Sequence, residues 1–357
     1  MAKTVKADAP KKSIAEKIKG FPTWFGGLTD TNKLLTITIV VFFVMYLCAI
    51  IFEGQGFLKP QAFCNMLNAN AALIITSCGM SIVMITGGID ISVGGVVALV
   101  SMSCAVYLDY HGGSIVGSLL ISLAIGLAFG LFQGLLVAYL DIQPFIVTLA
   151  GMFFAKGMTT IVHTDPFNVV NEKFVALKDT RINLPLIGSY NKKGIFINAY
   201  VEIGVIVALL LVALLFWMLR YTKLGRSFYA VGGNSQSALM LGINVKRTRF
   251  ISHVICGVLA GIGGYVYFMH VGCGAPTNAS GMEMNAIASS IIGGTMLTGG
   301  VGNLIGTLFG VMSLATIKDM VASAGLDDAW WTGITIAAML CIFLVVQSVV
   351  ISQKKKA

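Results

Sequence analysis

Apolar runs separated by short polar segments fill the chain from about residue 34 to about residue 350. Most runs carry few charges and are long enough to cross a hydrocarbon core of about 30 Å as a helix. The pattern predicts an all-α, polytopic integral membrane protein with about ten transmembrane helices and glycine-interrupted segments. A membrane β-barrel would instead show segments of about ten residues with strict alternation. The predicted spans are 34–52, 67–85, 93–108, 114–140, 145–162, 200–219, 250–269, 286–297, 304–320 and 330–350.

The basic residues gather beside these runs in three blocks, at 1–33, 220–249 and 354–356. The blocks hold seven lysines, six Lys/Arg and three lysines, which are 16 of the 24 basic residues. Cytoplasmic segments of membrane proteins carry such an excess. If the N-terminus lies in the cytoplasm, ten spans place all three blocks and the C-terminus in the cytoplasm as well. The expected organisation is a basic segment at 1–33, a transmembrane domain at 34–350 and a tail at 351–357.

The longest polar segment between spans is 163–199, which this topology places outside. Apolar residues alternate with polar ones near 182–187 and again near 195–197, so we expect a small β-hairpin there. Trp330 and Trp331 begin the last predicted span at its outer end, where an aromatic belt would lie.

Composition excludes several classes of function. Only 11% of residues are charged, against about 25% in soluble domains, and mean hydropathy is +0.87. The net charge of +9 lies in the topological blocks without interleaved aromatics, so we expect no nucleic-acid partner. The histidines and cysteines lack metal-ligand spacing. The sequence has no phosphate-binding loop and no nucleophile motif, so we expect no enzyme activity, metal or cofactor on this chain.

Glycine interrupts the predicted spans at two places, GGIDISVGG (87–95) and GGTMLTGGVGN (293–303). Irregular backbone at membrane depth is tolerated where protein covers it or where it lines a water-filled path. For Asp90, the alternatives are a solvated loop carboxylate or an N-cap for a helix at 92–100. The candidates for a translocation path are Gly87, Gly88, Asp90, Ser92, Gly94, Gly293, Gly294, Gly299 and Gly300.

Glycines also recur at four-residue spacing inside spans, at 126, 130 and 134 and at 257 and 261. Such ridges let two helices approach closely, so we expect them to pack. Glu283 stands where the eighth span begins and could cap that helix. Lys318 and Asp319, near the outer end of the ninth span, are expected to be structural.

The basic stretch 220–249 contains a short isolated helix. Asn234 or Ser235 can cap its start by accepting a backbone hydrogen bond, and Gly242 can end it in the left-handed conformation. The residues between are too few for a helix that is stable alone in water. The helix therefore packs either against its own chain or against another one.

Three long stretches, 87–95, 225–249 and 281–310, resemble the membrane subunits of bacterial sugar ABC importers, the ribose/galactose/xylose permease group. The likeness runs from about residue 34 to residue 350. QPFIVTLAGMFFAKG (143–157) and DAWWTGI (328–334) are most similar to the permease subunit of galactofuranose importers. Asn285 departs from the pattern, because the group often has an acid there, and we assign it no charge-based role.

The resemblance implies a permease subunit that moves a monosaccharide across the bacterial inner membrane. It also implies partners: ABC ATPase subunits that carry ATP and Mg, a second permease copy or sister permease, and a periplasmic sugar-binding protein. In such proteins a short cytoplasmic helix contacts the ATPase. Here that segment corresponds to Gly225, Arg226, Gly233, Asn234, Ala238, Leu241 and Gly242.

Two alternatives from other classes stay open at this point. A secondary transporter or channel that works alone would be driven by an ion, and it predicts acids buried at mid-membrane. A structural membrane scaffold is the other alternative.

Overall fold

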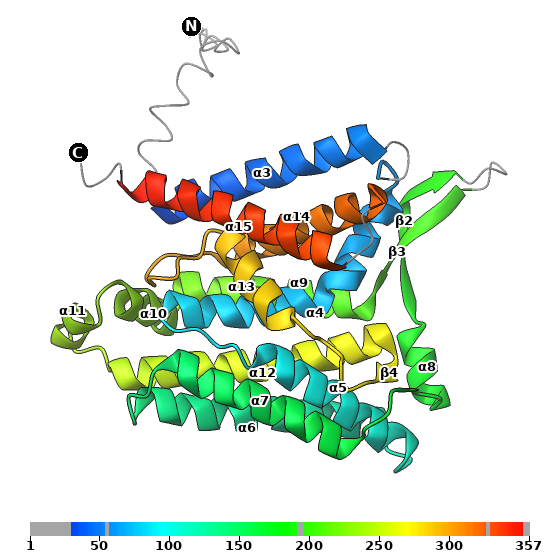
Figure 1. Cartoon of the computed structure of the whole chain (residues 1–357), viewed down its shortest axis with the longest axis horizontal. Coiled ribbons are helices and arrows are strands. Elements are labelled where there is room, and N and C mark those ends of the chain that lie inside the picture. The colour runs from blue at the N-terminus through cyan, green and yellow to red at the C-terminus, as the bar shows by residue number, and fades with distance from the viewer. Residues whose placement is uncertain (1–29, 54–56, 191–195, 326–328, 353–357) are drawn as a thin grey trace, which may run out of the picture.

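The apolar runs form helices that lie side by side along the long axis of the molecule (Figure 1). The computed structural model describes residues 30–53, 57–190, 196–325 and 329–352. Seven helices in these ranges are long and apolar enough to cross a membrane: α3 (Asp30–Glu53), α4 (Pro60–Ile85), α6 (Ile115–Ala138), α7 (Pro144–Val162), α9 (Ile203–Tyr221), α12 (Val245–Val271) and α14 (Leu304–Ser323). Two further apolar stretches lie in α5 (Val93–Asp109) and α15 (Ala329–Ser352). The predicted all-α, polytopic class is confirmed.

The eighth predicted span differs most from expectation. Its helix, α13 (Met282–Ile292), has 11 residues and is about 16 Å long, roughly half of a hydrocarbon core. The prediction that it continues to residue 297 is wrong. Gly293 is its C-cap and Gly294 has φ +86, a conformation that no helix continues through. Most of the 1–33 segment and most of the tail lie outside the described residues.

Helix α12 forms the centre of one side of the bundle, where it packs against α4, α5 and α6. The two predicted glycine ridges meet there. A Cβ added at Gly126 would lie 2.9 Å from the Gly261 Cα, and one at Gly130 would lie 2.9 Å from the Val254 Cα. Glycine is therefore what allows the backbones of α6 and α12 to touch.

Helices α3, α14 and α15 form the other side, and α4 lies between the two sides (Figure 1). Buried hydroxyls join α4 to the short helix α13 and to α14. Ser77 Oγ lies 2.9 Å from Ser289 Oγ, and Ser81 Oγ lies 2.7 Å from Thr307 Oγ1. From α3, the Thr38 hydroxyl donates a hydrogen bond to the Ile292 carbonyl at the end of α13, at 2.8 Å. These bonds fix α13 between longer helices.

Two polar regions cap opposite ends of the bundle (Figure 1). One holds α10 (Lys223–Gly233) and α11 (Ser235–Met240), and we call it the α11 end. The other, the hairpin end, holds α8 (Glu172–Lys178), the two-residue pair β1 (Phe167–Asn168) and β4 (Cys273–Gly274), and the antiparallel hairpin of β2 (Arg181–Tyr190) and β3 (Phe196–Glu202). The predicted hairpin is confirmed.

Candidate functional site

The short helix expected within 220–249 is α11. Asn234 caps its start, because the Asn234 side chain accepts a hydrogen bond from the Ser237 N–H at 2.9 Å. Gly242 follows its end with φ +79, and the Gly242 N–H donates to the Leu239 carbonyl. The side chain of Ala238 is buried against the rest of the chain. Both predicted ends of the helix are confirmed.

One face of α11 is left exposed by the residues that the structure describes. Leu239, Met240 and Leu241 are exposed over 62%, 86% and 79% of their surface. They lie beyond the ends of the membrane-spanning helices, where exposed apolar side chains usually contact a partner. Packing of this helix against its own chain is therefore confirmed at Ala238, and contact with another chain stays a prediction. Ala238 packs inward, and the next three side chains face outward.

Helix α10 was not predicted, although its sequence carries a signal. Thr222 caps its start by accepting from the Gly225 N–H at 3.2 Å. Leu224, Phe228 and Val231 follow at helical spacing, and the last two are buried. Gly225 lies directly against the Leu219 backbone of α9. The basic residues of this stretch lower its average hydropathy, so the apolar spacing did not lead to a predicted helix. Arg226 of α10 lines a cavity of about 540 Å³ between α3, α9, α10 and α14.

The C-terminal end of α10 touches the end of α4 and the second glycine interruption, which in turn touches the first one at Gly87. A Cβ at Gly232 would collide with the Ile85 carbonyl at the end of α4. A Cβ at Gly299 would lie 2.8 Å from the Gly232 oxygen and 3.0 Å from the Gly87 Cα. The Gly300 N–H donates to the Ile85 carbonyl at 2.9 Å. Three backbone segments distant in sequence therefore meet without side chains between them.

A side chain secures the same junction. The hydroxyl of Tyr229 on α10 donates to the Gly302 carbonyl at 2.9 Å. Burial raises the pKa of this phenol to about 12, and the nearby Arg220 lowers it in part. The phenol is therefore protonated, and able to donate, throughout the physiological pH range.

Asp90 in the first interruption is buried and not a solvated loop residue. Its Oδ1 accepts from the Ser92 N–H at 3.0 Å and from the Ser92 hydroxyl at 2.6 Å. The same hydroxyl lies 3.1 Å from Gln133 Oε1 on α6. Asp90 thus holds the turn that leads into α5, which begins directly after Ser92. The N-cap of α5 is Ser92, so the N-cap role considered for Asp90 from the sequence is wrong.

The glycines of the first interruption divide into two groups. Gly87 and Gly88 line a cavity of about 290 Å³ near the start of α12, together with Asp141, Arg249 and His253. Gly94 and Gly95 instead lie in the first turn of α5 and allow close packing. A Cβ at Gly95 would lie 2.9 Å from the Met152 carbonyl of α7.

The predicted glycines of the second interruption all lie against protein. A Cβ at Gly293 would lie 2.6 Å from the Thr307 Cα, and one at Gly294 would lie 2.9 Å from the Leu34 Cβ. A Cβ at Gly300 would lie 2.7 Å from the Gly233 Cα. Their contacts join α13, α14, α3 and α10, and a role in a translocation path stays a prediction.

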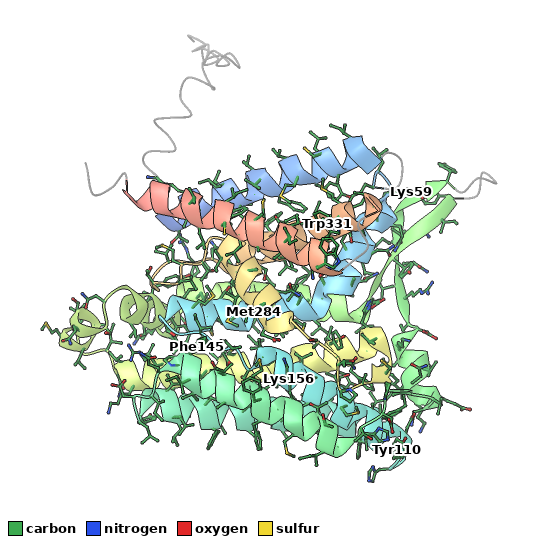
Figure 2. All side chains as sticks on the ribbon, viewed as in Figure 1. Lys59, Tyr110, Phe145, Lys156, Met284 and Trp331 are labelled. Atoms are coloured by element: carbon green, nitrogen blue, oxygen red, sulfur yellow. The ribbon has the colours of Figure 1, made fainter. Side chains whose placement is uncertain are left out.

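A charged pair of one partly exposed and one buried side chain lies midway along the bundle. Lys156 Nζ of α7 is 3.3 Å from Glu283 Oε1 of α13, and the Lys156 side chain is 35% exposed whereas that of Glu283 is 7% exposed. Figure 2 shows Lys156 and Met284 midway along the bundle. The N-cap of α13 is Gly281, with φ +77, so the expectation that Glu283 caps this helix is wrong. The sequence singled out Glu283 but gave no signal that it pairs with Lys156.

Glu283 also abuts Gly94. A Cβ at Gly94 would collide with Glu283 Oε2, an oxygen with no hydrogen-bond partner among the described residues. The first turns of α5 and α13 therefore meet at the buried carboxylate.

Comparisons with known proteins agree with this arrangement. A family described as "Branched-chain amino acid transport system / permease component" matches residues 62–344. The chain is 36% identical over 316 residues to the inner membrane ABC transporter permease protein YjfF of Escherichia coli, which covers 88% of this chain and 92% of that protein. No solved structure matches the chain.

Two further relatives carry a sugar in their names. The chain is 32% identical over 335 residues to the fructose import permease protein FruG of Bifidobacterium longum (90% of this chain, 93% of that protein). It is 32% identical over 303 residues to the ribose import permease protein RbsC of Bacillus subtilis (85% and 88%). The family match covers most of the chain, and of the long helices described only α3 lies wholly outside it. The chain therefore belongs to this family of permease components and is a non-catalytic, multi-pass membrane subunit of an ABC transporter.

Proposed function

We propose that this chain is the permease of an ATP-driven importer that moves a monosaccharide across the bacterial inner membrane. In this proposal the α11 end and both termini are cytoplasmic, and the hairpin end faces outside. The placement of basic residues at 1–33, 220–249 and 354–356 supports this orientation. The hairpin end, including 163–199, is the side on which a periplasmic sugar-binding protein would dock.

The observation that carries the proposal is the position of α11. Its exposed residues Leu239, Met240 and Leu241 offer an apolar surface to ATPase subunits, which would hold the ATP and Mg. A helix seated in a partner's groove transmits motion well, because side chains at three- and four-residue spacing lock it in place. Gly232, at the end of α10, then passes the motion by direct backbone contact to Ile85 and Gly299.

The choice of a sugar rests on relatives and on resemblance. FruG and RbsC are named for the import of fructose and ribose, and two stretches, 143–157 and 328–334, resemble galactofuranose permeases. Galactofuranose is accordingly our specific candidate. The family description names branched-chain amino acids, so an uptake panel needs leucine as well as ribose, fructose and galactofuranose.

A second permease, either another copy or a sister subunit, is the expected partner within the membrane, and lipid covers the remaining apolar surface. The exposure of Lys156 supports a partner on the face of α7 and α13. An ammonium group facing lipid midway through the bilayer is costly. A second subunit or a water-filled path against this face removes that cost.

The proposal is tested by co-purification with ATPase subunits and by uptake of the panel. Ala238→Arg places a charge where α11 packs on its own chain, and Met240→Gln removes exposed apolar surface only. Both should weaken ATPase association and uptake while membrane insertion stays intact. Val170→Gln is the matched control for ATPase association alone, because Val170 is 77% exposed and lies at the opposite end, where the sugar-binding protein would dock. Wild-type uptake by Ala238→Arg would contradict the docking role of α11.

The buried Glu283 favours one alternative, an ion-driven transporter that works alone. The two functions differ in their energy source. Uptake by this chain without ATPase subunits, unaffected by ATP depletion and abolished by an ionophore, would overturn the importer proposal.

A further inference from the structure

A third cavity, separate from the α11 end, lies between α4, α12 and α14 beside the first turn of α13. Its volume is about 290 Å³. Small-molecule sites measure about 300–1,000 Å³, so this cavity suits a ligand at the small end of that range. The polar residues that line it are Asn70, Tyr267, Thr277, Ser280, Asn285 and Lys318. We infer that this cavity holds the transported monosaccharide midway along the path, an inference that rests on the proposed function.

The lining chemistry matches a neutral sugar. Asn70 and Asn285 each present a carboxamide, which donates and accepts hydrogen bonds as a sugar hydroxyl does. Thr277 and Ser280 add hydroxyls that can do both. Lys318 is the one charged residue among the described lining residues, and without a carboxylate the cavity does not select a cation.

The amides are available to a ligand. Asn70 Nδ2 donates one hydrogen bond within the described ranges, to the Met66 carbonyl at 2.9 Å. Its Oδ1 can therefore accept a hydrogen bond from a ligand, and its second N–H can donate one. Across the described ranges, the Asn285 side chain makes no hydrogen bond to protein, and it is partly buried. A partly buried amide facing a cavity is stabilised when a ligand or water supplies its missing bonds.

One wall of the cavity is preorganised. The Ala279 N–H donates to the Tyr267 hydroxyl at 3.2 Å, and Asn278 Nδ2 reaches both Ser101 Oγ and the Cys273 carbonyl. Ala279 has φ +55, a conformation that costs energy for a residue other than glycine and often marks a functional site. The chain that delivers Ser280 and Asn285 is therefore held in one conformation.

The position of α13 connects the cavity to the α11 end. Asn285 lies in the first turn of this helix, and Gly293 follows its last residue. The helix is about 16 Å long, and the segment after it carries Gly299 and Gly300, which touch Gly232 and Gly233. Motion of α10 would thus reach the sugar cavity through a single short helix. No other part of the path needs to recognise the sugar for this coupling to work.

The experiment uses the full transporter in membranes, with D-ribose, D-fructose and D-galactose (which includes its furanose form) as probes. Asn70→Ala and Asn285→Ala should each raise the KM for the transported probe about fivefold to tenfold, the effect of losing one or two hydrogen bonds. Asn65→Ala is the matched control. It removes an exposed amide from the same helix as Asn70, outside the cavity, and should leave KM unchanged.

A labelling readout separates binding from folding. Ser280→Cys is made in a chain whose partly exposed Cys48, Cys273 and Cys341 are replaced by serine. The transported probe should slow its reaction with an aqueous maleimide, and a sugar that is not taken up should not. Asn65→Cys should react at the same rate with or without sugar. Normal uptake without protection at 280 and without a KM change would overturn the inference and leave the proposed function intact. No uptake of any probe would count against the proposed function and this inference together.

Discussion

The Gly300 N–H donates a 2.9 Å hydrogen bond to the carbonyl of Ile85, and these two residues lie 215 positions apart in the chain. The bond joins the end of α4 to the loop between α13 and α14. Gly232 of α10 lies so close to both groups that a Cβ there would collide with the Ile85 carbonyl. A movement of α10 must therefore displace both interruptions together, because no flexible side chain separates the three backbones.

Tyr229 gives this junction a pH dependence that can be measured. In the unfolded chain the phenol loses its proton near pH 10, whereas in the folded chain its pKa is about 12. The unfolded state therefore binds fewer protons between these values, and stability should fall as pH rises from about 10 to about 12. Below pH 10 both states are protonated, so this group adds no pH dependence.

Thermal unfolding of wild type and Tyr229→Phe at pH 8 and pH 11 checks this prediction. The variant should be about 0.5–1.5 kcal/mol less stable at pH 8, because it loses the bond to Gly302. The gap should narrow at pH 11. Equal gaps at the two pH values would show that Tyr229 does not titrate in this way.

The pair of Lys156 and Glu283 predicts an asymmetric mutational response. Lys156→Met leaves a buried carboxylate without its cation. Breaking a fully buried pair costs about 3–5 kcal/mol, and we expect about 2–3 kcal/mol here because Lys156 is partly exposed. The double variant Lys156→Met/Glu283→Gln should recover part of the loss, since it removes the charge. The measurement compares the melting temperatures of the purified wild type, single variant and double variant. A double variant no more stable than the single one would contradict this account.

Close packing of α6 on α12 predicts that a glycine-to-alanine substitution costs stability at the contact between these helices and not at an open position. Gly126→Ala should destabilise the protein by about 1–3 kcal/mol, because its Cβ would enter the backbone of α12. Gly157→Ala on α7 should be neutral or slightly stabilising, because nothing lies within 4 Å of its Cβ. Thermal unfolding in one detergent compares them, and similar losses for both would refute the packing argument.

Features encoded locally could be predicted from the sequence. The caps at Asn234 and Gly242 required only neighbouring residues, and the hairpin within 163–199 followed from alternation. Helix α10 escaped because its basic residues dominate the average hydropathy, although Thr222, Phe228 and Val231 mark it. The overlong eighth span arose from treating apolar character as helical length across Gly293 and Gly294.

Features that depend on distant segments could not be predicted. The glycine ridges were recognised, but nothing in either one identifies the other as its partner. The same holds for Lys156 and Glu283, and for strand β1, whose Phe167 pairs with Gly274 more than a hundred residues away. The junction at Gly232 belongs to this group, because the sequence shows a glycine but not which distant backbone packs against it.

The most direct test of the account compares two adjacent glycines of α10. Gly232→Ala places a Cβ against Ile85, whereas Gly233→Ala meets nothing within 4 Å. Both variants should insert and bind ATPase subunits, and ATP hydrolysis and sugar uptake are measured for each in proteoliposomes. The account predicts that Gly232→Ala retains hydrolysis but loses at least about tenfold in uptake, equivalent to about 1.4 kcal/mol of coupling, while Gly233→Ala stays near wild type. Wild-type uptake by Gly232→Ala, or an equal loss in both variants, would contradict it.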